Sequence, residues 1–202
     1  VPEEARGWLQ ARLGVACVGE QIAKDVLFLQ GDGSNGKSLL ANDGVVRAMG
    51  GYATIKSSDF LSADMWRGAG ASPDIADLRG RRIVLVEETP SDFKLNTNAI
   101  KRLAGTNQIT ARKLYKDPIT FGASHDLLVA TNHHPRVTDG DWGVWRRLSL
   151  LEFGFRFTTR PVGPNDRRSD LGLDHRIRWN GDGQWDAIIT WLVEGCIRGL
   201  RE

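Results

Sequence analysis

This 202-residue sequence has little cysteine: it contains only Cys17 and Cys196. The two lie near opposite ends and lack the close spacing of paired metal ligands, so we expect two buried thiols in a reducing compartment. Long hydrophobic runs are also missing. The longest cover residues 83–86 and 187–193, well short of the roughly 18 residues that a membrane span needs. With no signal peptide visible, we expect a cytoplasmic protein without a membrane partner.

A strong charge of either sign is absent as well. The 27 basic and 25 acidic side chains give a net charge of +2, which is too small to identify a nucleic-acid partner. The positive charge is instead local, because residues 101–116 contain five basic side chains and no acidic one. A hydrophobic content of 41% is enough for one large domain. The first residue is Val1 rather than Met, which predicts a piece of a longer protein.

Short apolar runs and helical periodicities alternate along the chain. The predicted strands cover residues 26–29, 52–55, 83–86, 127–131 and 148–153. The predicted helices cover residues 3–18, 39–49, 58–66 (capped by Ser58 or Asp59), 96–104 (capped by Asn96 or Thr97) and 184–200. This alternation predicts an α/β domain with a central, mostly parallel sheet and helical segments at both ends. We further expect a hairpin formed by residues 109–115 and 119–121, and a loop over residues 158–170.

Residues 31–38 read G-D-G-S-N-G-K-S and match the pattern G-x-x-x-x-G-K-S between a predicted strand and a predicted helix. In such a loop, backbone N–H groups surround the β- and γ-phosphates of a nucleotide, and the helix N-terminus adds partial positive charge. We expect Lys37 to bridge these phosphates and Ser38 to hold Mg²⁺. The expected nucleotide-binding residues are Gly31, Gly33, Ser34, Asn35, Gly36, Lys37, Ser38 and Leu39.

The same glycines also spell the dinucleotide-binding pattern G-x-G-x-x-G. That pattern requires an acidic residue roughly 20 positions further on, whereas residues 55–57 read I-K-S. It also leaves Lys37 and Ser38 without a role. The sequence therefore favours a phosphate loop.

Polar side chains follow two of the predicted strands. Glu87 and Glu88 come directly after residues 83–86. In ATPases with this loop one acid supports Mg²⁺ and another polarises the attacking water, so we assign Glu87 to the metal and Glu88 to the water, with solvated acids as the alternative. Asn132 follows residues 127–131, and its amide could hold that water and contact the γ-phosphate, although a turn asparagine is also possible. The adjacent His133 and His134 lack zinc spacing.

Two basic stretches complete the set. Arg146 and Arg147 precede the strand at residues 148–153; they are either surface charge or an arginine finger that reaches a neighbouring subunit's phosphate. Arg112, Lys113, Tyr115 and Lys116 fall at the tip of the predicted hairpin. Cations beside an aromatic ring could grip a nucleic-acid backbone, and a solvated hairpin is the alternative. The spacing does not distinguish DNA from RNA.

Several ordered segments resemble the superfamily 3 helicases, especially the C-terminal domain of phage, plasmid and poxvirus-type primase-helicases. These segments are N-G-K-S at 35–38, L-R-G-R-R-I at 78–83, I-K-R-L-A-G at 100–105, I-T-A-R at 109–112, A-T-N-H at 130–133 and W-R-R-L at 145–148. The resemblance runs from about residue 3 to residue 199. In one departure, members of this branch often carry a small residue where Glu87 stands.

The resemblance implies an AAA+-like ATPase core, a homohexameric ring, ATP with Mg²⁺, and a hairpin that moves along single-stranded DNA. By matching position it implies catalytic roles for Lys37, Glu88, Asn132 and one of the arginine pair, of which we favour Arg147. It also implies a primase domain upstream in the full-length protein, and the host cytoplasm as location if a phage or plasmid encodes it.

We expect three regions: a helical segment at residues 1–24, the ATPase core at 25–157, and a loop with a closing helix at 158–202. The sequence favours an ATP-dependent DNA helicase motor. Two alternatives stay open. One is an initiator or assembly module that uses ATP only to build a ring on DNA, and the other is a small-molecule kinase with the same loop.

Overall fold

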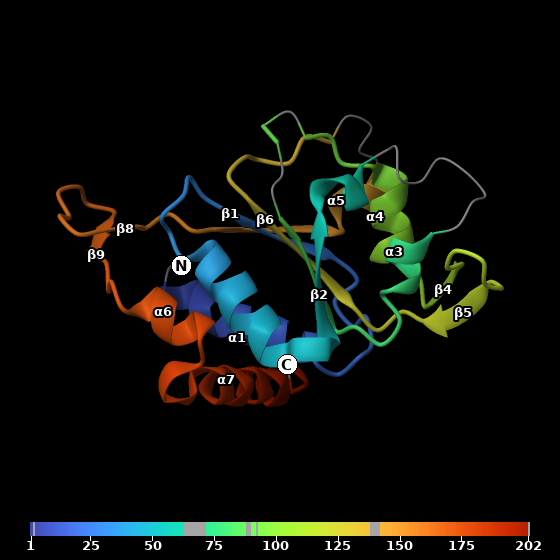
Figure 1. Cartoon of the computed structure of the whole chain (residues 1–202). Coiled ribbons are helices and arrows are strands. Elements are labelled where there is room, and N and C mark those ends of the chain that lie inside the picture. The colour runs from blue at the N-terminus through green and yellow to red at the C-terminus, as the bar shows by residue number, and fades with distance from the viewer. Residues whose placement is uncertain (2, 63–71, 88–89, 92, 138–141, 202) are drawn as a thin grey trace.

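A five-stranded parallel sheet forms the centre of the molecule (Figure 1). The computed structural model describes residues 1, 3–62, 72–87, 90–91, 93–137 and 142–201. The strands are β1 (Val26–Gln30), β2 (Ala53–Ser57), β3 (Ile83–Glu87), β6 (Asp126–Thr131) and β7 (Leu148–Glu152). Their order is β2-β3-β6-β1-β7, and every pairing is parallel. All five carboxyl ends therefore lie at one edge, where ligands of open α/β sheets bind.

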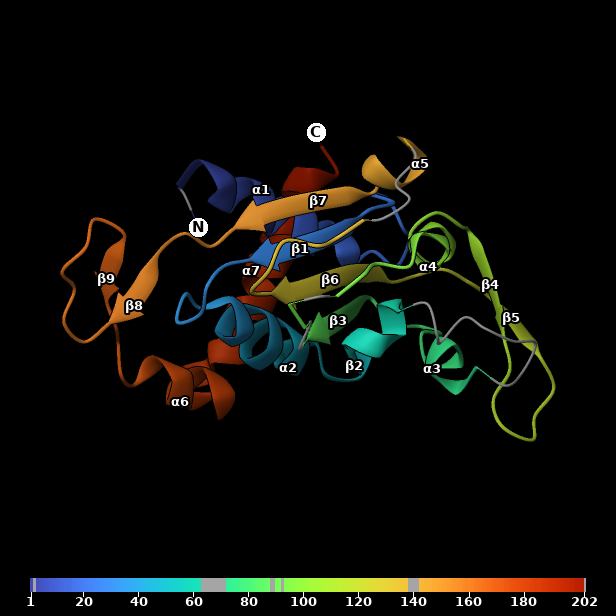
Figure 2. The same cartoon turned by 90° about the horizontal axis from the view of Figure 1, so that it is seen from above.

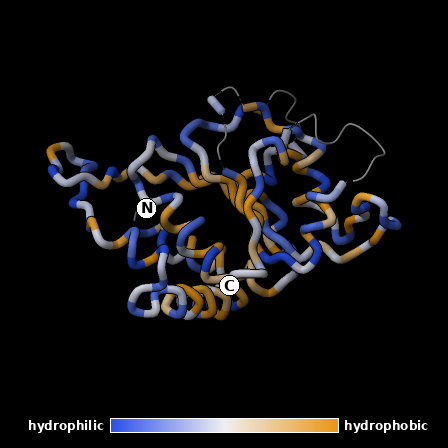
Figure 3. The backbone as a smooth tube through the Cα atoms, in the orientation of Figure 1, coloured by the Kyte–Doolittle hydropathy of each residue, from blue (hydrophilic) through white to orange (hydrophobic). Residues whose placement is uncertain are grey.

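The central strands are apolar on both faces because helices cover both. In β1, Val26 and Phe28 point to one face, while Leu27 and Leu29 point to the other. β3 and β6 alternate in the same way, as expected for strands buried on both sides. Figure 3 shows these strands as a continuous hydrophobic bundle.

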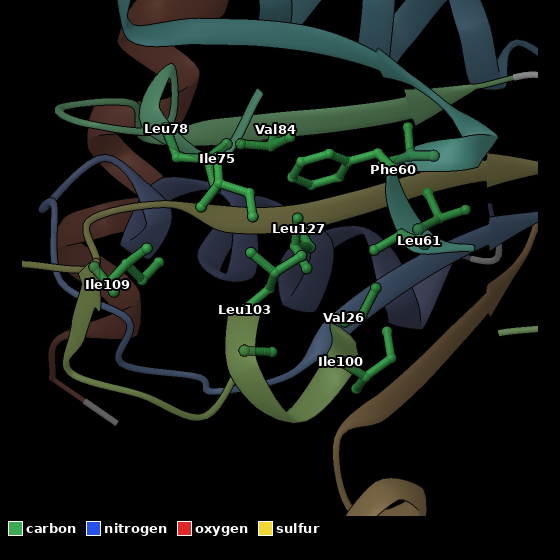
Figure 4. Packing of buried hydrophobic residues seen from close by; sticks show 14 of the residues in the cluster. Val26, Phe60, Leu61, Ile75, Leu78, Val84, Ile100, Leu103, Ile109 and Leu127 are labelled. Carbon is green, nitrogen blue, oxygen red and sulfur yellow. The ribbon is translucent and has the colours of Figure 1, made fainter. Parts of the chain in front are cut away.

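One face packs against the short helices η3 (Ser58–Leu61), α3 (Pro73–Ala76) and α4 (Thr97–Leu103). Ile100 and Leu103 of α4 are fully buried there against Leu127 of β6 (Figure 4). The predicted cap of α4 is confirmed: Asn96 Oδ1 accepts hydrogen bonds from the backbone N–H groups of Asn98 and Ala99 at 2.9 and 3.2 Å. α5 (Trp142–Trp145) lies next to α4 and precedes β7 in the chain.

The opposite face packs against the helices from both chain ends, α1 (Glu3–Ala16) and α7 (Gln184–Gly199), which lie against each other (Figure 2). Their backbones approach closely at Gly14 and Gly195, where a Cβ atom would overlap the backbone of the other helix. The helix after the glycine-rich loop lies on the same face. It is wound as a π-helix, η1, over Leu39–Val46 and continues through α2 (Arg47–Met49) and η2 (Gly50–Tyr52).

Two small paired units lie at opposite ends of the molecule (Figures 1 and 2). The predicted hairpin is confirmed as β4 (Gln108–Ala111) antiparallel to β5 (Ile119–Gly122), but its first strand ends at Ala111 and not at Tyr115. The loop predicted over residues 158–170 is partly wrong. β8 (Arg156–Thr158) pairs in parallel with β9 (Asp166–Arg168), and α6 (Leu173–Arg178) and η5 (Gly181–Gly183) follow. The turn is stable because the Asp166 carboxylate accepts N–H bonds from Val162 and Gly163, both at 2.9 Å.

Two further expectations are corrected. The helix predicted from Ser58 is only the single turn η3, without a side-chain cap, because the chain is already extended at Ser62; residues 63–66 lie outside the described residues. The two thiols are partly rather than fully buried. Within the described part of the chain, no helix combines the length and the apolar character needed to cross a bilayer.

Candidate functional site

The glycine-rich loop, residues 31–38, connects β1 to the following helix at the carboxyl edge of the sheet. Gly33, Ser34 and Gly36 have positive φ angles of 102°, 49° and 84°, a conformation that glycine adopts without steric cost. A Cβ atom at Gly31 would lie 2.7 Å from the carbonyl oxygen of Phe153 and would overlap the Asn35 side chain. Two of these glycines are thus required by backbone conformation, and Gly31 by close packing.

Lys37 is the most unusual residue of the loop, because its charged side chain is almost completely buried, with 5% of the residue exposed. Its ammonium group donates to the carbonyl oxygen of Gly31, to Asn35 Oδ1 at 3.1 Å and to Asn132 Oδ1 at 3.2 Å. Among the described residues these hydrogen-bond partners are all neutral oxygens. Burial lowers the pKa of Lys37, and the charge of Asp32 partly offsets this. A buried cation with neutral partners is a strong site for an anion.

The strand order brings the predicted polar residues to this loop. Since β6 lies between β1 and β3, Asn132 after β6 stands between the loop and Glu87 at the end of β3. The Glu87 carboxylate accepts a hydrogen bond from Asn42 Nδ2 at 2.8 Å. Asn42 lies one helical turn after Ser38, so the helix that begins in the loop also orients the acid. Glu88 lies outside the described residues.

A cavity of about 550 Å³ opens between these groups. It is lined by Lys37, Ser38, Asn42, Asp43, Arg47, Glu87, Ala130, Asn132 and Arg178. Its wall therefore carries three cations and two carboxylates. The Asp43 carboxylate accepts hydrogen bonds from Arg47 Nε at 3.1 Å and from Arg178 Nη2 at 3.3 Å. The arrangement suits an anionic ligand that also brings oxygen atoms for a hard cation near Ser38 and Glu87.

The other side of the glycine-rich loop faces a second cavity of about 620 Å³. Gly31, Gly33, Ser34 and Asn35 line it, together with residues that follow β7. The two cavities share no lining residue. The loop therefore separates them. Of the predicted nucleotide-binding residues, Lys37 and Ser38 line the first cavity and Gly31, Gly33, Ser34 and Asn35 line the second, while Gly36 and Leu39 line neither.

The arginine pair is not part of this cavity. The carbonyl oxygen of Arg147 accepts from Val26 N–H at 2.8 Å, which places the pair at the amino edge, one strand length of about 16 Å from the loop. The Arg147 guanidinium turns inward: Nη1 donates to the Gly143 carbonyl oxygen, and the group packs against Gly105. Arg146 is exposed.

The predicted nucleic-acid-binding residues are also distant from the loop. Arg112, Lys113, Tyr115 and Lys116 lie in the connection between β4 and β5, and all are exposed. Tyr115, with φ of 56°, has a fully exposed ring. The hairpin thus presents three cations and one aromatic ring to solvent.

Sequence reasoning missed four charged or polar residues of the first cavity: Asn42, Asp43, Arg47 and Arg178. Asn42 could have been found, because it follows Ser38 by four residues and so shares its helix face. Arg178 carried no comparable signal, since only the packing of α6 against η1 brings it to the cavity.

The fold and this cavity define an α/β protein whose candidate site lies at the carboxyl edge of a parallel sheet, beside a buried lysine. The chain belongs to the DUF5906 family, described as a family of unknown function, whose model matches residues 29–147.

Curated relatives come from large DNA viruses. "Putative helicase L207/L206" of Acanthamoeba polyphaga mimivirus is 30% identical over 186 residues, 92% of this chain and 19% of that protein. "Putative helicase 022R" of Frog virus 3 is 29% identical over 96% of this chain and 20% of that protein. "Putative primase C962R" of African swine fever virus is 27% identical with the same coverage. This chain thus spans about a fifth of these relatives' length.

Among solved structures, the C-terminal region of NrS-1 has a similar fold. The TM-score is 0.64 with 15% sequence identity, over 92% of this chain and 41% of that one. At this identity the likeness concerns the fold alone.

Proposed function

We propose that this chain is the ATPase motor of a viral or plasmid DNA replication protein. In this proposal it acts as a DNA helicase that moves along single-stranded DNA. The observation that carries the proposal is the buried Lys37 ammonium, held by neutral oxygens at the carboxyl edge of the sheet. A polyphosphate is the ligand that such a cation, placed beside a glycine-rich loop and a helix N-terminus, binds best. The printed names of the relatives, helicases and primases, support a role in replication.

In this proposal ATP is the substrate, and its phosphates lie over the glycine-rich loop. Lys37 contacts the β- and γ-phosphates and leaves its hydrogen bond with Asn132, which then becomes available to the γ-phosphate. Ser38 and Glu87 both line the cavity, and their oxygens fit Mg²⁺, a hard cation that prefers oxygen ligands. When bound, Mg²⁺ neutralises phosphate charge and helps to align the reacting groups. Asn42 orients Glu87 through the 2.8 Å hydrogen bond.

The proposed general base is Glu88, which follows Glu87 directly in the sequence. Its role is to polarise the water that attacks the γ-phosphate. Glu88 and Asn132 together favour a motor that hydrolyses ATP over a module that only binds it, because neither residue is needed for nucleotide affinity alone.

The exposed tip of the β4–β5 hairpin is proposed to bind DNA. Arg112, Lys113 and Lys116 contact phosphates, and Tyr115 stacks on a base. The hairpin and the β8–β9 unit next to the glycine-rich loop lie at opposite ends of the molecule (Figure 1), so ATP hydrolysis would act on DNA through movement of the sheet and its helices.

The arginine pair at the amino edge is too far from its own glycine-rich loop to contact the same nucleotide. A finger role therefore requires a neighbouring copy, and we propose a homohexameric ring. The side-chain placement favours Arg146 over Arg147, because Arg146 is exposed whereas Arg147 is held against Gly143 and Gly105. The full-length protein is proposed to carry a primase domain upstream, as the relatives' names suggest.

ATP hydrolysis and strand displacement on a forked duplex test the proposal, measured on the full-length protein. We expect DNA-stimulated hydrolysis and unwinding, both abolished in Lys37→Ala and retained in Lys24→Ala, an exposed control. Lys116→Ala should keep basal hydrolysis and lose the stimulation. Hydrolysis without any strand displacement would favour an ATP-controlled assembly module. Activity on a small-molecule acceptor by a monomer would favour a kinase.

Mixing two inactive variants tests the finger. Arg146→Ala mixed with Lys37→Ala should regain part of the hydrolysis, since a ring then contains sites with an intact loop and an intact neighbouring arginine. Arg147→Ala in the same mixture is the comparison. Recovery with Arg147→Ala but not with Arg146→Ala would reverse the assignment, and recovery with neither would contradict a finger acting between subunits.

A further inference from the structure

Among the described residues that line the first cavity, Arg178 alone comes from the part of the chain that follows β7. It is the last residue of α6, and it shares the cavity wall with Lys37, Ser38 and Glu87. α6 packs across η1, which carries Asp43 into the same wall. A guanidinium is thus placed in a cavity whose other cations already suit a phosphate.

The contacts of Arg178 are those of a side chain that can change partners. Nε and Nη2 lie 3.3 Å from the two Asp43 oxygens, and Nη2 also lies 3.1 Å from Asp174 Oδ1. Its side chain is 44% exposed, and ion pairs of exposed side chains are weak. Among the described residues these bonds use only Nε and Nη2, which leaves the Nη1 protons available to a further acceptor.

Asp43 would keep a partner if Arg178 moved. Its carboxylate also accepts a hydrogen bond from Arg47 Nε at 3.1 Å, and only 12% of its side chain is exposed. Removing one of two guanidinium groups therefore leaves no uncompensated buried charge, which would otherwise be costly. Asp174 is 58% exposed and returns to water.

The backbone that carries Arg178 is fixed. The indole N–H of Trp185 donates to the carbonyl oxygen of Ile177 at 2.7 Å, and the backbone N–H of Trp185 donates to Asn180 Oδ1 at 2.8 Å. At the other end of the same segment, Phe157 N–H donates to the Ser34 carbonyl oxygen in the glycine-rich loop at 2.7 Å. Residues 157–178 are therefore hydrogen-bonded to the loop at one end and reach the cavity at the other, so rotation of the Arg178 side chain is the movement that the exchange needs.

We propose that Arg178 is a second phosphate-binding cation of the site, acting within the same chain, and that it exchanges its contacts with Asp43 and Asp174 for a phosphate of the bound nucleotide. This inference rests on the proposed function, because it assumes a polyphosphate beside Lys37. It assigns to α6 the role of placing a guanidinium on the ligand, distinct from the arginine pair at the amino edge. Guanidinium groups bind phosphate oxygens through paired hydrogen bonds.

Equilibrium binding of Mg-ATP and of inorganic tripolyphosphate, measured by calorimetry on the full chain, tests this role. Arg178→Ala should weaken both ligands by the same factor, about tenfold for a charge-assisted contact, and Arg178→Lys should recover part of the loss. The matched control is Arg176→Ala, two residues earlier on α6, whose guanidinium pairs with Asp170 at 2.6 Å and does not line the cavity. It should bind both ligands like wild type.

A gain of affinity separates ligand contact from a purely structural role. Asp174→Asn removes the competing carboxylate, so both ligands should bind two- to threefold more tightly, on the order expected for an exposed ion pair. Arg178→Ala binding like wild type, while Lys37→Ala loses binding, would overturn the inference and leave the proposed function intact. A loss confined to ATP would also overturn it, because the contact would then be to the nucleoside. Absence of binding by the wild type would overturn both.

Discussion

A buried histidine at the amino edge of the sheet should make the stability of the fold depend on pH. His125 immediately precedes β6 and is 0% exposed. Among the described residues neither ring nitrogen has a hydrogen-bond partner, while its backbone oxygen accepts from Gln21 Nε2 at 2.8 Å. Burial lowers the pKa of His125 from 6.5 to about 4, because removal from water disfavours the charged imidazolium.

The size of the effect follows from the difference between the folded and unfolded pKa values. Above pH 6.5 the ring is neutral in both states and contributes no pH dependence. Between pH 6.5 and 4 the unfolded chain binds a proton that the folded chain does not, so stability falls by about 1.4 kcal/mol per pH unit. The whole interval corresponds to about 3 kcal/mol, and the part down to pH 5 to about 2 kcal/mol.

Urea denaturation of wild type and His125→Phe at several pH values measures this contribution. The free energy of unfolding of wild type minus that of the variant should decrease by about 2 kcal/mol between pH 7 and pH 5, whatever the cost of the substitution itself. Groups that titrate in both proteins cancel in this difference. A difference that stays constant with pH would refute the argument, because the imidazole would then be protonated alike in both states.

Three further outcomes follow from close packing and burial. Gly195→Ala places a Cβ against the backbone of Gln10 and should destabilise the α1–α7 contact by about 3 kcal/mol, lowering the melting temperature by roughly 6–12 °C in a calorimetric scan. Gly31→Ala should keep the fold and abolish Mg-ATP binding, since its Cβ forces Asn35 and Phe153 apart; unchanged calorimetric titrations would contradict this. Burial, with a smaller contribution from Cys196, raises the pKa of Cys17 to about 11; because burial remains in Cys196→Ala protein, Cys17 should still react with iodoacetamide at pH 8 more slowly than a thiol of ordinary pKa.

The sheet and the centre of the site were predictable because local sequence determines them. Continuous apolar runs mark strands that are buried on both faces, and residues 26–29, 83–86 and 127–131 all lie in such strands. The glycine-rich loop, Glu87 at the end of β3 and Asn132 after β6 then meet at one edge, because parallel strands share the edge at which they end. The contact of Lys37 with Asn132, 95 residues apart, follows from this rule.

The rest depended on tertiary contacts that no local pattern reveals. β8 and β9 are three residues each and form because the Asp166 carboxylate closes a turn that reads as a loop. Arg178 reaches the cavity only because α6 packs on η1. The preference for Arg147 as the finger came from matching position in the family resemblance, whereas exposure, which favours Arg146, depends on the packing around Gly105.

The proposed function depends on the binding of a polyphosphate at Lys37, facing Glu87. Calorimetric titration of Mg-ATP into wild type, Lys37→Ala and Lys24→Ala measures this binding. We expect wild type and Lys24→Ala to bind alike, and Lys37→Ala to bind at least about a hundredfold more weakly, the loss expected for a buried charge-assisted contact. Equal affinity in Lys37→Ala and wild type would show that the nucleotide does not bind at Lys37.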